Sequence, residues 1–189
     1  MAGKTQKKAT SAIHFGVRGS ITRLIRSNRS LFRIYLVFGV TLLVIFTILM
    51  VKPIYYKVIM PFNEFLTWSS AMALNVLGGE TVSSSGTNLS SNEFSMSLAE
   101  GCNGIYALSI VIAGIVAFPA RWRPKLIGLV LAIALIMILN YIRILTLWYA
   151  GKAGSFLFDT MHLYVWEFII ITLGAAFWYF WYEKFVKKR

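Results

Sequence analysis

Long apolar runs dominate this sequence and leave little of it for a soluble domain. The first strong run covers residues 31–51, and three more cover about 105–118, 126–149 and 163–181. A helix rises about 1.5 Å per residue, so about 20 apolar residues are needed to cross roughly 30 Å of membrane hydrocarbon. Because a span must also satisfy its own backbone hydrogen bonds, these runs should be helices. The sequence therefore predicts an all-α membrane protein, a small bundle of about four transmembrane helices.

Lysine and arginine are concentrated at three places along the chain. Eight lie within residues 4–33, three within 121–125 and four within 184–189. Basic residues beside membrane spans stay mainly in the cytoplasm, and four spans place all three clusters on one side. We therefore expect a multi-pass protein of the cytoplasmic membrane, with both termini in the cytoplasm and residues 52–101 outside.

The net charge of +12 follows from this topology and suits contact with anionic lipids of the bilayer. The basic arm lacks a pattern of basic residues interleaved with aromatic ones, and it has no recognisable nucleic-acid-binding fold. We therefore expect a membrane partner and no nucleic-acid partner.

The spans and charges divide the chain into an arm and one domain. Residues 1–30 form a basic cytoplasmic arm, and residues 31–189 form a single transmembrane domain. Within that domain, segment 58–77 is apolar but interrupted by polar residues, so we expect an interfacial or re-entrant helix. Residues 79–101 follow from a Gly-Gly pair and show short polar–apolar alternation, which predicts a small extracytoplasmic loop or β-hairpin.

Three residues near the expected outer ends of the spans form a candidate catalytic group. Cys102 is the only cysteine and lies between Gly101 and Gly104, where we expect it to begin the second span. A thiol in the first turn of a helix is favoured as the thiolate. Arg143 lies inside the third span, a position that costs several kcal/mol unless it faces the bundle or water. His162 is expected to open the last span, so all three should meet near the outer face.

A thiolate, a guanidinium and an imidazole together suit acyl transfer. Cys102 would attack a carbonyl, Arg143 would stabilise the thiolate or the oxyanion, and His162 would protonate the leaving amine. Each also has a structural reading: a packed thiol, an arginine paired to a carboxylate or to carbonyls, and a histidine at a helix end. We expect no cofactor and no metal, because a Cys–His pair supplies too few ligands. Possible supporting residues are Asn140, Asn103 and Glu167.

The motifs around these residues resemble the exosortase/archaeosortase family of polytopic membrane cysteine transpeptidases. The resemblance rests on Glu100-Gly101-Cys102-Asn103-Gly104-Ile105, on Asn140-Tyr141-Ile142-Arg143-Ile144 and on His162, within about residues 61–182. It implies that Cys102 is the nucleophile, Arg143 the family's invariant arginine and His162 the third catalytic residue. The chain is a short variant, with fewer spans before the catalytic core than the larger exosortases.

The resemblance also implies a function. The enzyme would be a cysteine peptidase and transpeptidase acting on secreted proteins that carry a C-terminal sorting tail: a short motif, a transmembrane helix and a basic cluster. It would cut near the motif at the outer face and transfer the new carboxyl end to an acceptor such as a lipid or a surface polymer. The alternative is a non-catalytic membrane assembly or scaffold subunit for secreted or surface proteins.

Overall fold

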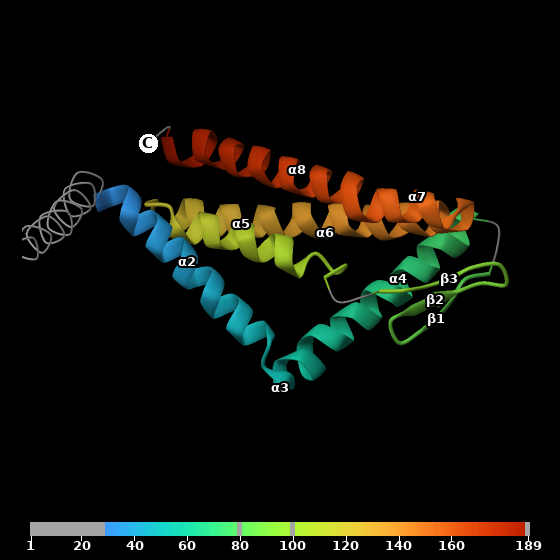
Figure 1. The fold of residues 1–189 in the computed structure, drawn as a ribbon. Coiled ribbons are helices and arrows are strands. Elements are labelled where there is room, and N and C mark those ends of the chain that lie inside the picture. The colour runs from blue at the N-terminus through green and yellow to red at the C-terminus, as the bar shows by residue number, and fades with distance from the viewer. Residues whose placement is uncertain (1–28, 79–80, 99–100, 188–189) are drawn as a thin grey trace, which may run out of the picture.

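The structure is a computed structural model that describes residues 29–78, 81–98 and 101–187. The expected basic arm, residues 1–30, lies almost wholly outside the described residues. Most of the described chain is helical (Figure 1). The elements in chain order are α2 (Arg29–Leu49), α3 (Lys52–Ile54), the π-helix η1 (Tyr55–Ile59), α4 (Met60–Gly78), β1 (Ser83–Ser85), β2 (Asn88–Ser90), β3 (Ser95–Ser97), α5 (Ile105–Ala117), α6 (Trp122–Ala153), α7 (Ser155–Thr160), η2 (Met161–Val165), α8 (Trp166–Trp181) and η3 (Tyr182–Lys187).

Three helical stretches are long and apolar enough to cross a membrane. They are α2, α6 and the continuous helix from Ser155 to Lys187, of 21, 32 and 33 residues. The fourth expected span is α5, which has 13 residues and so measures about 20 Å, less than the roughly 30 Å hydrocarbon core. The all-α membrane fold is confirmed, with three long helices and one short apolar helix.

Helix α4 forms where the sequence indicated an apolar segment that does not cross. It is not among the helices apolar enough to span. Helix α4 follows α3 and η1 along one course, whereas α2 approaches α3 from another direction. Helices α2 and α4 therefore form a V with α3 at its vertex (Figure 1). Its far half packs against α6, where the Tyr141 hydroxyl donates a hydrogen bond of 2.8 Å to the Ser69 carbonyl. Helix α4 therefore lies beside the bundle and carries the sheet.

The small sheet has three antiparallel strands in the order β1-β2-β3. Gly86 makes the β1–β2 turn at φ +58°, a left-handed conformation that glycine adopts without steric penalty. Strand β3 extends the expected hairpin, with Leu89 opposite Met96. Alternate side chains face a cluster shared with α4 and α6, which includes Leu74 and Trp148. The sheet is thereby fixed on the bundle at the end away from the C-terminus (Figure 1).

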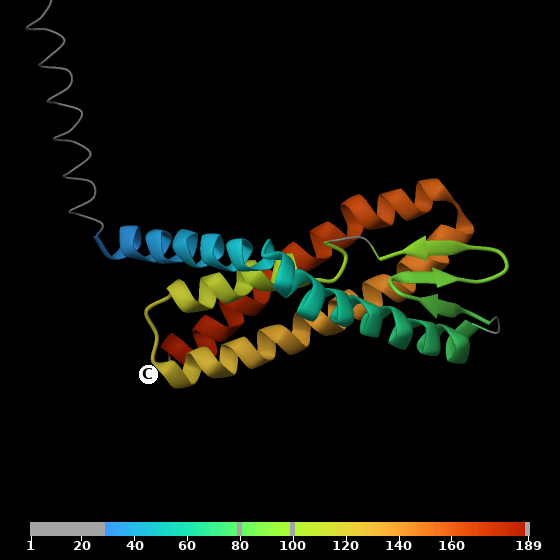
Figure 2. The ribbon, with the colours of Figure 1, turned by 90° about the horizontal axis from the view of Figure 1, so that it is seen from below.

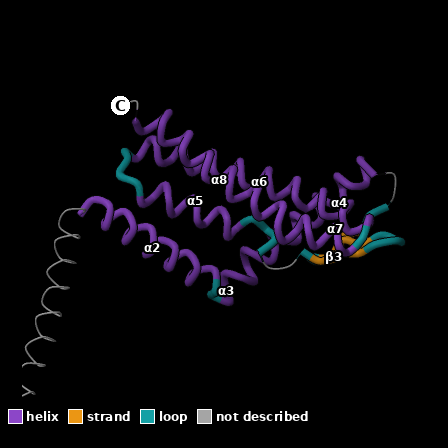
Figure 3. The backbone as a smooth tube through the Cα atoms, turned by 45° about the horizontal axis from the view of Figure 1, so that its top comes forward, coloured by secondary structure: helices purple, strands orange, loops and turns teal. Residues whose placement is uncertain are grey.

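The helices α5, α6 and α8 run side by side (Figures 1 and 3). Close packing between α6 and the last helix depends on Gly128, because a Cβ there would lie 2.4 Å from Nε1 of Trp181. That nitrogen donates a hydrogen bond of 2.8 Å to the Pro124 carbonyl. This pairing holds α8 against α6 at the end far from the sheet and fixes the depth of the residues between them.

Candidate active site

Cys102 lies in a turn just before α5 rather than in the first turn of the helix. Gly101 and Gly104 adopt φ values of +96° and +75°, which interrupt a right-handed helix and which other residues rarely adopt. The helix therefore begins at Ile105, and the expectation that Cys102 begins it was wrong. At the start of α5, Oδ1 of Asn103 accepts a hydrogen bond of 3.1 Å from the Ile105 amide. The turn presents the thiol beside the helix end instead of within it.

His162 comes from the last helix, which packs beside α5, and reaches the thiol. Its Nε2 lies 2.9 Å from Sγ of Cys102, at hydrogen-bond distance, with the donor set by the histidine tautomer. The ring stacks on Phe158, with centroids 5.6 Å apart and planes 12° from parallel. The stacking and the sulfur contact together fix the imidazole plane.

His162 does not open the last helix, as the sequence analysis expected. The helix already begins at Ser155, after Gly154 at φ +145°, so His162 lies about two turns inside it. It belongs to the π-helical segment Met161–Val165. Such π segments widen the helix locally and are frequent at functional sites. Here the wider turn carries the imidazole that meets Cys102.

Arg143 lies on α6 and joins this group through the backbone of His162. Its Nη2 donates a hydrogen bond of 3.3 Å to the His162 carbonyl oxygen. The side chain is only 7% exposed, and its Nε has no hydrogen-bond partner among the described residues. Glu167 is exposed, and none of the ion pairs among the described residues joins it to Arg143. Arg143 therefore supports the turn that carries the imidazole.

Asn140 lies one turn before Arg143 and packs under the cysteine turn. A Cβ placed on Gly104 would lie 3.1 Å from both Cβ and Cγ of Asn140. The Asn140 side chain is 1% exposed, and neither amide atom has a hydrogen-bond partner within the described part of the chain. The asparagine thus contacts the cysteine turn by packing and does not hold the guanidinium.

Asn63 on α4 is a site residue that sequence reasoning missed. Its Oδ1 accepts a hydrogen bond of 3.0 Å from Nδ2 of Asn103, and the side chain is buried. In the sequence it was only one of the polar residues interrupting an apolar segment. A buried amide in such a segment is a signal that it meets another polar group, but nothing in the local pattern identifies Asn103 as that group.

A comparison with protein-family models places this chain. The family model described as transmembrane exosortase matches residues 22–178, a range that contains Cys102, Arg143 and His162. The chain belongs to the exosortase family. Neither the curated proteins nor the solved structures contain a significant match. Membership of the exosortase family indicates a transpeptidase-type role in the membrane, and the resemblance drawn from the short motifs is confirmed.

In this exosortase-family chain the cysteine turn also borders a cavity of about 370 Å³. Gly101 and Asn103, the neighbours of Cys102, line one wall, and Lys52, Tyr55 and other residues of the α2–η1 corner line the opposite wall. The cavity therefore lies between the cysteine turn and the elbow that joins α2 to α4. It offers a mixed apolar, aromatic and cationic surface of a size typical of ligand pockets.

Proposed function

We propose that this protein is a membrane cysteine transpeptidase in which Cys102 and His162 act as a nucleophile–base pair. The observation that carries the proposal is the 2.9 Å separation of Sγ and Nε2, within the reach required for proton transfer between a nucleophile and its base. Family membership supplies the reaction class, and these two atoms supply a geometry that fits it.

The reaction follows from these groups. His162 takes the proton of the Cys102 thiol, and the thiolate attacks the carbonyl carbon of a peptide bond in the substrate. The C–N bond breaks, and the leaving amine takes the proton from the imidazolium, which leaves a thioester on Cys102. An acceptor nucleophile then attacks the thioester and gives its proton to His162, and the thiol is regenerated. Water as the acceptor would give hydrolysis.

Arg143 has two roles in this proposal. Its hydrogen bond to the His162 carbonyl positions the π-helical turn, and its positive charge, held in a buried site, favours the anionic thiolate. Its Nε has no hydrogen-bond partner within the part of the chain that the structure describes, which leaves one donor for a group that arrives with the substrate. Asn103 and Asn63 act as positioning residues, because their mutual hydrogen bond ties the cysteine turn to α4.

The proposed substrate is a secreted protein with a C-terminal sorting tail: a short motif, a transmembrane helix and a basic cluster. The enzyme would lie in the cytoplasmic membrane with both termini inside and with Cys102 near the outer face, where the tail's helix meets the exported domain. The cavity beside Gly101 and Asn103 gives room for substrate residues next to the scissile bond. The acceptor would be a lipid or a surface polymer.

Cleavage of a tailed protein encoded in the same genome, co-expressed with the full-length chain, tests the proposal. We expect Cys102→Ala to abolish cleavage at unchanged protein level and membrane insertion, and His162→Gln to slow it by about 10²- to 10⁴-fold. His14→Gln, which changes the only other histidine, is the matched control and should cleave normally. Normal processing by Cys102→Ala would refute the enzyme and favour the alternative of a non-catalytic assembly subunit.

Because Cys102 is the only cysteine, its alkylation rate reports the thiolate without any substrate. His162→Gln should slow alkylation by a membrane-impermeant reagent, since the base beside the sulfur is lost. Arg143→Lys keeps the charge but not the planar fork. It should therefore slow cleavage more than alkylation, and Arg123→Lys on the same helix should change neither. An equal loss in both assays would mean that the fork, through its hydrogen bond to the His162 carbonyl, sustains the thiolate as well as the cleavage step.

A further inference from the structure

The two outer edges of the small sheet differ in how far neighbouring elements cover them. On the β1 side, the Asn75 side chain pairs with the backbone of Val82: its Nδ2 donates to the Val82 carbonyl at 3.0 Å and its Oδ1 accepts from the Val82 amide at 2.6 Å. Strand β1 also lies along α4, whereas β3 lies at the edge away from α4 (Figure 2). The sheet thus has one covered edge and one open edge.

The register shows which groups of β3 point outward. The Ser91 amide donates to the Phe94 carbonyl and the Leu98 amide donates to the Thr87 carbonyl, both at 2.8 Å. Antiparallel pairs alternate between bonded and non-bonded, so the residues between Phe94 and Leu98 alternate as well. The amides and carbonyls of Ser95 and Ser97 therefore point away from β2. They have no hydrogen-bond partner in residues 29–78, 81–98 and 101–187.

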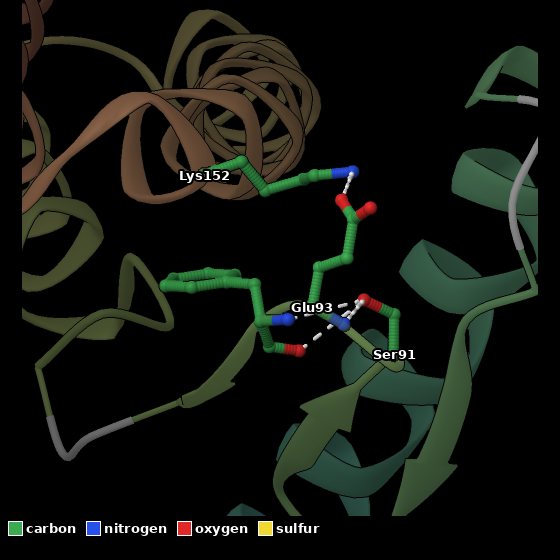
Figure 4. A network of polar contacts seen from close by, with 4 residues as sticks. Ser91, Glu93 and Lys152 are labelled. Atoms are coloured by element: carbon green, nitrogen blue, oxygen red, sulfur yellow. Dashed lines mark hydrogen bonds and ion pairs between the residues drawn. The ribbon is translucent and has the colours of Figure 1, made fainter.

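Strand β3 is held firmly at its start, on the face that packs on the bundle. The Phe94 ring meets Trp148 edge to face, with centroids 5.2 Å apart, and it fits over Gly151, where a Cβ would lie 2.2 Å from its Cζ. Glu93 pairs with Lys152 at 3.1 Å (Figure 4). The open edge is thus a row of backbone groups fixed in position before any partner arrives.

The strand also lies close to the nucleophile in the sequence. Ser97 is five residues before Cys102, a stretch that spans at most about 18 Å. The strand starts against the C-terminal end of α6 at Gly151, and the turn that carries Cys102 is the next described segment of the chain. Under the proposed function, a substrate would run from its exported domain towards its tail helix in the same direction. An extended segment laid along β3 would therefore run parallel to it and end at the thiol.

We propose that the open edge of β3 binds the substrate segment ahead of the cleavage point as a fourth, parallel strand. This inference rests on the proposed function. Ser95 and Ser97 exchange backbone hydrogen bonds with alternate substrate residues, the mode by which extended peptides add to open sheet edges. Recognition of that segment then depends on its extended backbone more than on its side chains, because both serines are small and exposed. The occupant is a peptide and not a second copy of this chain.

Proline substitution tests the edge without disturbing the rest of the sheet. Ser97→Pro removes an outward amide that takes no part in the β2 ladder. With substrate well below saturation, we expect cleavage to slow by roughly tenfold, the size expected for one lost backbone hydrogen bond together with a blocked edge. Ser84→Pro makes the same change at an outward amide on β1 and should leave cleavage near normal. Alkylation of Cys102 should be unchanged in both variants.

A second experiment tests the same pairing even if Ser97→Pro folds poorly. Proline is placed at each of the six substrate positions ahead of the cleavage point, against the wild-type enzyme. Pairing predicts inhibition at every second position, because alternate amides face β3. Equal cleavage of all six proline-substituted substrates would overturn the inference but not the proposed enzymatic function. Normal cleavage by a Ser97→Pro variant that is alkylated normally would have the same meaning. The inference would also be overturned if the only effect of Ser97→Pro were to convert a dimer of the protein into a monomer. Continued cleavage by Cys102→Ala would instead overturn the proposed function itself.

Discussion

Gly104 joins the backbone of the cysteine turn to the packing beneath it, and Gly104→Ala separates the two contributions. The residue has φ +75°, where an L side chain costs about 1–2 kcal/mol. Its new Cβ would also lie 3.1 Å from two carbons of Asn140, and overpacking of this kind costs about 1–3 kcal/mol. We therefore expect a total loss of about 2–5 kcal/mol.

Gly86→Ala is the matched control for the backbone contribution. Gly86 has φ +58°, and a Cβ added there would meet no heavy atom within 4 Å, so it should lose only the conformational share of about 1–2 kcal/mol. For a chain of this size about 1 kcal/mol corresponds to roughly 2–4 °C in melting temperature. Thermal unfolding of the full-length protein in the same detergent or nanodisc should therefore rank Gly104→Ala clearly below Gly86→Ala.

Asn140→Gly completes a double-mutant cycle. It removes both carbons that crowd the new methyl group, while its own cost within a helix appears in the single and the double variant alike and cancels. The double variant should be about 1–3 kcal/mol more stable than the sum of the singles predicts. Alkylation of Cys102 should fall in Gly104→Ala and recover in part in the double variant, because the clash displaces the sulfur from His162.

Two results would refute this reasoning. Equal melting temperatures for Gly104→Ala and Gly86→Ala would mean that the contact with Asn140 carries no free energy. Additivity of the cycle to within about 0.5 kcal/mol, with unchanged alkylation of Cys102, would mean that Asn140 does not position the turn.

Two further predictions concern the packing that fixes the helices. Trp181→Phe keeps most of a fully buried side chain but removes its hydrogen bond to the Pro124 carbonyl. Because that carbonyl loses this partner, the free energy of unfolding should fall by about 1–3 kcal/mol. An unchanged melting temperature would contradict this prediction. Glu93→Gln removes an ion pair with Lys152 in which the glutamate is 72% exposed. The free energy of unfolding should therefore change by less than about 1 kcal/mol. A larger loss would show that the pair stabilises the fold more than an exposed ion pair does.

The apolar runs and short motifs of the sequence were enough to predict the class of fold and to select Cys102, Arg143 and His162 as candidates, but not Asn63. Long apolar runs must become helices in a membrane whatever their neighbours are, because the backbone has no other hydrogen-bond partners there. The glycines around Cys102 and at Gly154 likewise mark breaks through their own conformational freedom. The order of cysteine, arginine and histidine was sufficient to indicate the family, which the match over residues 22–178 confirms.

Local pattern was less informative about where helices begin. Cys102 was expected inside α5 and His162 at the head of the last helix, yet α5 begins at Ile105 and the last helix at Ser155. In both cases glycine conformations decide the boundary, and a sequence pattern does not show which glycine takes positive φ. The short length of α5 follows from the same turn.

Which side chains meet depends on how the helices and the sheet pack together. Cys102 and His162 are 60 residues apart, and their contact depends on how α5 and the last helix are rotated and how closely Gly128 lets the helices approach. The pairing of Asn63 with Asn103 and the open edge of β3 are of the same kind. Such contacts depend on the relative placement of elements that are distant in sequence, and hydrophobic periodicity, which reports only the burial of one face, carries no information about that placement.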